Sequence, residues 1–193
     1  MDAIETLELN GYTLNIYRDE CPMNPREWED NLGILYIPRP PRGCHFSDDG
    51  ANNADALAAP VQIPVYCLDH SGIYIGPRNP GDSWDSWLAG VYYVPAERIR
   101  AEYKDAPDAI EQARNVALAE LKRFSDYVEG DCYYYTIENA AGDLLDSCGG
   151  YIGDGEIKYI HEIFRDFVDG ELRAENPLFV AAGLDPVTGL AIA

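Results

Sequence analysis

The order of the strand-like segments constrains the fold of this chain more than any other feature. Seven segments alternate in polarity or are rich in β-branched and aromatic residues, which is typical of strands. They cover residues 11–17, 32–37, 63–68, 73–75, 88–94, 132–137 and 143–148. Short turn sequences at residues 69–72 and 139–142 separate two pairs of them, which is the spacing of β-hairpins. Regular alternation of strand and helix is absent, so the pattern favours a mostly antiparallel sheet.

Two later segments have the periodicity of helices. Apolar residues at steps of three or four predict a helix over residues 107–128, and Gly130 suits its end. A similar pattern predicts a second helix over residues 156–171. We therefore predict an α+β fold in which two main helices pack on a mostly antiparallel sheet of about six strands.

The length predicts one domain over residues 1–193. Residues 38–60 are rich in Pro, Gly, Asp, Asn and Ala, which predicts a long loop with a short helix near residues 54–59. The stretch from residue 176 is apolar but carries Pro and Gly, so we expect a loosely packed C-terminal tail or a segment that serves a partner.

The charge of the chain is strongly unbalanced. It has 34 acidic and 14 basic residues, and the formal net charge is −20 at pH 7. The acids are spread along the chain, and the aromatic content of 11% is too high for a disordered protein. Phosphates would meet net repulsion, which argues against direct nucleic acid binding over a broad face. The charge is either a general adaptation for solubility or a recognition surface for a basic partner.

The sequence also bears on the compartment. No apolar stretch reaches the length of a membrane span, and residues 1–5 lack the basic head and apolar core of a signal peptide. An odd number of cysteines, five, favours reduced thiols. We expect a cytoplasmic protein with no membrane partner.

Candidate metal ligands and nucleophiles are few. Cys44, His45, Cys67 and His70 supply four nitrogen and sulfur ligands of the kind that zinc prefers, although a core cysteine, a loop histidine and a turn explain them more simply. Cys67 and His70 would point to opposite faces of a strand, which disfavours a thiol nucleophile. The acidic loops do not match a calcium-binding loop, and the glycine-rich residues 149–153 lack the end of a phosphate loop. We expect no cofactor and no enzymatic activity.

Tryptophans beside acids suggest a protein interface instead. Aromatic anchors with an acidic rim suit a partner that is rich in Arg or Lys, although the same rings could simply cover the sheet. The candidate partner-binding residues are Glu27, Glu29, Asp30, Asp82, Trp84, Asp85, Trp87, Tyr92, Asp143 and Asp146.

Four segments together resemble a known family. They are residues 24–33, residues 64–73, Trp84-Asp85-Ser86 with residues 90–94 and 100–103, and residues 146–154. In that order they resemble a family of small acidic proteins carried by phages, plasmids and other mobile elements. This chain departs from the pattern at Trp87-Leu88-Ala89 and in its long loop at residues 38–60.

The resemblance implies an accessory protein that works inside a bacterial cell and counters host defence. We expect an anti-CRISPR or antirestriction inhibitor whose carboxylates mimic DNA and bind the basic, nucleic-acid-binding surface of a defence complex. One alternative is a zinc-binding domain or enzyme that uses Cys44, His45, Cys67 and His70. Another is a host-takeover adaptor that binds a different protein through its tyrosine-rich sheet.

Overall fold

The computed structural model describes residues 2–81 and 84–175. These residues divide into two compact units. Unit 1 contains the described residues up to Pro22 and from Cys132 onward, and unit 2 contains Met23–Asp131. Each unit has its own sheet and its own hydrophobic core.

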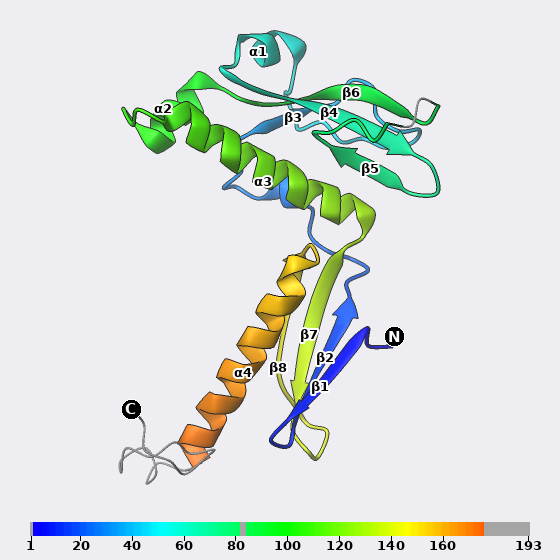
Figure 1. The fold of residues 1–193 in the computed structure, drawn as a ribbon, viewed down its shortest axis with the longest axis vertical. Helices are drawn as coiled ribbons and strands as arrows, with labels where there is room; N and C mark the ends of the chain where they lie inside the picture. The colour runs from blue at the N-terminus through cyan, green and yellow to red at the C-terminus, as the bar shows by residue number, and fades with distance from the viewer. Residues whose placement is uncertain (1, 82–83, 176–193) are drawn as a thin grey trace. The chain divides into compact units, whose positions relative to one another are not determined.

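Unit 1 is a four-stranded antiparallel sheet with one helix on it (Figure 1). Its elements are β1 (Glu5–Leu9), β2 (Tyr12–Arg18), β7 (Cys132–Glu138), β8 (Leu144–Ile152) and α4 (Gly155–Glu175), with strand order β1-β2-β7-β8. Alternate residues of β2 and β7 point to the helix, because successive side chains of a strand face opposite sides. The buried core contains Leu14, Ile16, Tyr135, Ile137, Ile160, Phe164 and Val168, among others.

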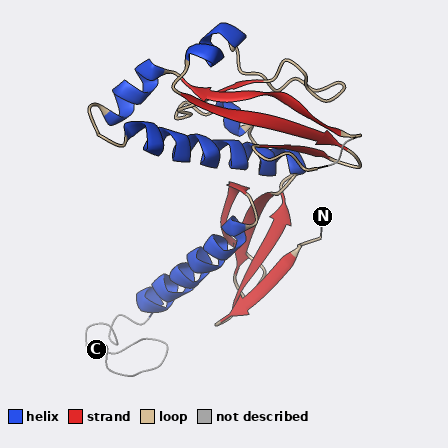
Figure 2. Ribbon diagram, turned by 45° about the horizontal axis from the view of Figure 1, so that its top comes forward, coloured by secondary structure: helices blue, strands red, loops and turns tan. Residues whose placement is uncertain are grey.

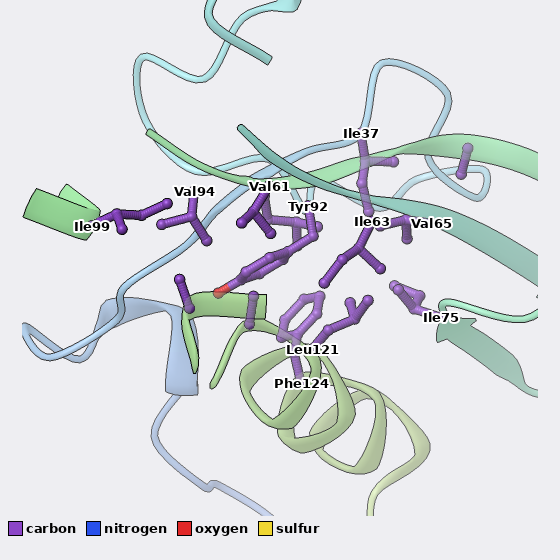
Figure 3. Packing of buried hydrophobic residues seen from close by; sticks show 14 of the residues in the cluster. Ile37, Val61, Ile63, Val65, Ile75, Tyr92, Val94, Ile99, Leu121 and Phe124 are labelled. Atoms are coloured by element: carbon purple, nitrogen blue, oxygen red, sulfur yellow. The ribbon is translucent and has the colours of Figure 1, made fainter. Parts of the chain in front are cut away.

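Unit 2 has a second four-stranded antiparallel sheet, with α3 along one face (Figure 2). Its strands are β3 (Ile34–Tyr36), β4 (Val61–Asp69), β5 (Ile73–Gly76) and β6 (Ser86–Val94), in the order β3-β6-β4-β5. Its helices are η1 (Pro25–Glu27), α1 (Asn53–Ala58), α2 (Ala96–Tyr103) and α3 (Ala109–Glu129). Figure 3 shows Leu121 and Phe124 of α3 meeting Ile63 and Tyr92 of the sheet in the largest buried cluster.

The structure confirms the predicted class and most of the elements. The fold is α+β with antiparallel sheets, both hairpins form, and the two helices predicted late in the chain are α3 and α4. The short helix expected inside the loop at residues 38–60 is α1. Within residues 2–81 and 84–175 the strands number eight rather than about six, and they form two sheets rather than one.

The single domain expected over residues 1–193 stays a prediction, because two compact units can unfold either together or separately. The C-terminal tail expected from residue 176 lies outside the described residues.

Candidate functional site

A polar network centred on Arg26 lies inside unit 2. The side chain of Arg26 is only 6% exposed, and all five of its N–H donors are used. Nε donates to Asp48 Oδ1 at 3.1 Å and Nη2 to Asp48 Oδ2 at 2.6 Å. Nη1 donates to Asn31 Oδ1 at 2.9 Å and to the hydroxyl of Tyr92, and Nη2 also donates to the carbonyl of Gly33 at 2.9 Å. The guanidinium therefore has no donor left for a ligand.

Glu120 of α3 completes the network from the other side. Its carboxylate is buried, and it accepts hydrogen bonds from Leu32 N at 2.6 Å and Gly33 N at 3.0 Å. The Tyr92 hydroxyl donates to Glu120 Oε2 at 2.6 Å. Burial raises the pKa of Tyr92 far above its usual value, so the phenol stays neutral and remains a donor. A Cβ at Gly33 would lie 1.9 Å from the Tyr92 ring, so only glycine fits there.

The network fixes the position of the segment that contains η1. Asn24 Oδ1 accepts a hydrogen bond from Arg26 N at 2.9 Å, which caps the short helix. Asn31 Nδ2 donates to the carbonyls of Pro25 and Trp28, both at 2.8 Å. The side chains of Asn24 and Asn31 thus hold the backbone of the segment, and Asn31 is itself bound by the buried Arg26 guanidinium. The groups of the network are hydrogen-bonded to one another, and together these bonds hold the backbone in place.

Exposed carboxylates line two hollows, and each hollow includes residues of this segment. Glu27 and Asp49 line one cavity of about 560 Å³. Glu29, Asp30 and Glu102 line a second hollow of about 390 Å³. All five side chains are exposed. We call these five residues the acidic ridge.

Basic side chains near the acidic ridge bind other groups. Arg98 also lines the second hollow, and its Nη1 donates to the carbonyls of Asn31 at 3.0 Å and Leu32 at 3.2 Å. The guanidinium carbon of Arg123 lies 5.1 Å from the centre of the Trp28 ring. Arg98 thus contacts backbone carbonyls and Arg123 contacts a ring. These two cations do not neutralise the acidic ridge by forming ion pairs with its carboxylates.

The structure brings together only some of the predicted residues. Glu27, Glu29 and Asp30 form the core of the ridge, and sequence reasoning missed Asp49 and Glu102. No local sequence pattern indicates that Asp49 and Glu102 belong to the ridge, because both come from parts of the chain outside the segment that carries Glu27, Glu29 and Asp30.

The candidate aromatic anchors differ in their exposure to solvent. Trp84 is 93% exposed, whereas Trp87 is partly buried and its Nε1 donates to the carbonyl of Arg39 at 2.8 Å. Asp85 Oδ2 lies 2.7 Å from His70 Nδ1. The prediction that Tyr92 contacts a partner is wrong, because its side chain is fully buried under α3. Asp82 lies outside the described residues.

The last two candidates belong to unit 1. Asp143 is exposed and accepts a hydrogen bond from Asn139 Nδ2 at 3.0 Å. Asp146 accepts one from the Tyr135 hydroxyl at 2.8 Å. Both lie on the β7–β8 hairpin, so they are not members of the acidic ridge.

The four possible zinc ligands are not assembled. Across residues 2–81 and 84–175, no group of three or more His, Cys, Asp or Glu side chains is arranged to hold a metal ion. Cys67 is buried in the core, while His45 lines the cavity beside Arg26 and His70 contacts Asp85. The geometry therefore does not support the zinc alternative.

None of the helices in residues 2–81 and 84–175 is both long and apolar enough to cross a membrane.

Thiol reactivity should follow burial. Cys67 is fully buried, and burial raises the pKa of its thiol to about 11, so at pH 8 it holds almost no thiolate. We expect iodoacetamide at pH 8 to modify the exposed Cys21 and Cys148 in the native protein, and the buried Cys67 and Cys132 only after unfolding. Peptide mass spectrometry gives the rate at each site. Native labelling of Cys67 as fast as that of Cys21 would contradict this expectation.

Comparison with known proteins gives no relative: no family model, no curated protein and no solved structure matches this chain.

Proposed function

We propose that this protein is an inhibitor that binds the basic, nucleic-acid-binding surface of another protein. The observation that carries the proposal is the acidic ridge. Its central carboxylates Glu27, Glu29 and Asp30 are exposed, and the backbone that carries them is tied to the buried Arg26 network. Such a surface offers negative charge at fixed positions, as a phosphate backbone does.

The fixed backbone matters for affinity. A flexible acidic segment loses conformational entropy when it binds, whereas a segment that is already ordered loses less. The net charge of −20 adds long-range attraction to a cationic groove and should speed association. A high net charge can be explained by solubility alone. The ordered backbone of the acidic ridge is therefore the feature that favours recognition of a basic partner.

The biological setting is a further part of the proposal. The family resemblance implies a protein from a mobile element that acts in the cytoplasm of a bacterial host. Restriction and CRISPR complexes hold DNA through Lys and Arg, so an acidic ridge would compete with DNA for the same site. We therefore propose an anti-CRISPR or antirestriction role, without enzymatic activity.

Competition with DNA tests the proposal directly. A purified restriction or CRISPR complex is mixed with labelled DNA and increasing amounts of this protein, and the bound DNA is followed by gel shift. We expect displacement of DNA that weakens as salt is raised toward about 0.15 M and above, because screening shortens the range of charge interactions.

DNA binding that stays unchanged at every salt concentration, across representative complexes of both types, would refute the proposal. Capture of a host partner that has no nucleic-acid-binding surface would favour the adaptor alternative instead.

A further inference from the structure

A second surface of unit 2 has the opposite character to the acidic ridge. A groove of about 780 Å³ lies along α2 and the first turns of α3, a volume in the range of small-molecule sites. Most of its lining is apolar: Pro60, Ala96, Ile99, Ala106, Pro107, Ala109 and Ile110. Ile110 is 56% exposed, so its side chain offers apolar surface to a ligand.

Three cations surround this apolar lining. Arg100, Lys104 and Arg114 all line the groove. Arg100 and Arg114 make long contacts of 3.4 Å, to the carbonyls of Ala96 and Gln62. Among the described residues, none of the three cations forms an ion pair with a carboxylate, although the chain has 34 acidic residues. Their charges are thus available to an anion in the groove.

The backbone of Lys104 supplies an independent observation. Lys104 ends α2 with φ 53° and ψ −123°, a conformation that glycine adopts easily and other residues rarely do. A lysine held there strains the backbone. Residues in rarely populated backbone conformations cluster at functional sites, and here such a residue contributes a charge to the groove.

The balance of charge limits the class of ligand. Asp108 and Glu111 also line the groove, so its lining carries three positive and two negative groups. A polyanion such as DNA would be repelled by these two carboxylates, whereas a single negative charge matches the excess. Asp108 makes no side-chain capping bond, and Ala109 N donates to the carbonyl of Ala106. In the first turn of α3 this leaves the N–H groups of Ile110 and Glu111 open to an anion.

We propose that this groove binds a monoanionic amphiphile, a molecule with an apolar chain and one carboxylate. The chain lies on the apolar lining near Ile99 and Ile110, and the carboxylate meets Lys104 and Arg114. This site is separate from the acidic ridge and does not depend on the function proposed above.

Laurate, used with the full-length protein below its micelle concentration, is the probe, and dodecanol is its neutral match. We expect saturable laurate binding by isothermal titration calorimetry, with ¹H–¹⁵N chemical shift changes confined to residues of the groove. Dodecanol should bind more weakly, by about three- to tenfold, because it lacks the charge.

Two variants separate binding from folding. Lys104→Gly should weaken laurate binding by about three- to tenfold while raising the melting temperature, because it removes the cation and also relieves the strained backbone. Arg114→Gln should weaken binding by a similar factor. Arg78→Gln is the matched control, since Arg78 is an exposed cation of unit 2 outside the groove, and it should bind laurate normally.

Several results would overturn the proposal. They are non-saturable laurate binding, equal affinity for dodecanol, and unchanged affinity in both Lys104→Gly and Arg114→Gln.

Discussion

An Arg26→Met variant should lose about 3–5 kcal/mol of unfolding free energy, because removing one partner of a buried ion pair leaves the other charge without compensation. The Asp48 carboxylate would keep only the hydrogen bond from Leu35 N at 2.8 Å. The Tyr92 hydroxyl and the carbonyl of Gly33 would each lose a donor. Methionine fills similar space, so the loss reports on the polar groups rather than on a cavity.

Tryptophan fluorescence during urea unfolding measures this loss, because all three tryptophans, at positions 28, 84 and 87, belong to unit 2. Arg42→Met is the matched control: Arg42 is an exposed cation of the same unit, and its loss should change stability by no more than about 0.5 kcal/mol. Equal unfolding midpoints for Arg26→Met and Arg42→Met would show that the network does not stabilise unit 2.

The same experiment tests whether the chain behaves as one domain. Far-UV circular dichroism reports on both units, since each contains helix and strand. If Arg26→Met shifts the fluorescence transition and leaves part of the dichroism transition in place, the two units unfold separately. Coincident transitions in both signals would support a single cooperative domain.

Local sequence patterns predicted the helices and hairpins, because these elements form between residues that are close together in the chain. The helix α3 follows from apolar residues at steps of three and four, and the β4–β5 and β7–β8 hairpins follow from strand-like segments around short turns. The strand β1 was missed: its residues alternate between half-buried and exposed, and Glu5 and Glu8 obscure the apolar positions.

Long-range pairing explains most of what the sequence could not predict. Strand β2 pairs with β7, more than a hundred residues later, and this pairing separates the chain into two sheets. No local pattern specifies such a partner. The burial of Tyr92 does not follow from its own strand for the same reason, because the later helix α3 is what covers that side of the strand.

One residue of the buried network, Glu120, can be recognised from the sequence. Glu120 is three residues after Ala117 and four before Phe124, both of which are buried, so helical spacing places its carboxylate on the face of α3 that packs on the sheet. A charged residue on such a face needs partners. The sequence does not show that Leu32 N, Gly33 N and Tyr92 supply them, because these come from distant segments.

The second large effect concerns recognition by the acidic ridge. The triple variant Glu27→Gln, Glu29→Gln, Asp30→Asn should inhibit DNA binding by the target complex about ten- to a hundredfold less well. It should also show a weaker dependence on salt, since fewer charge contacts form. Stability should change little, because these three side chains are exposed and the Arg26 network that holds their backbone is intact.

A second triple variant separates recognition from general charge. Glu8→Gln, Asp166→Asn and Asp169→Asn removes three exposed carboxylates from unit 1, so both variants lower the negative charge by the same amount. If the net charge alone drives inhibition, the two variants lose the same activity. If the ordered ridge is what a cationic groove binds, only the first loses it. Full inhibition by the ridge variant would mean that the position of these carboxylates is irrelevant, and the proposed mechanism would then fail even if the protein still displaced DNA.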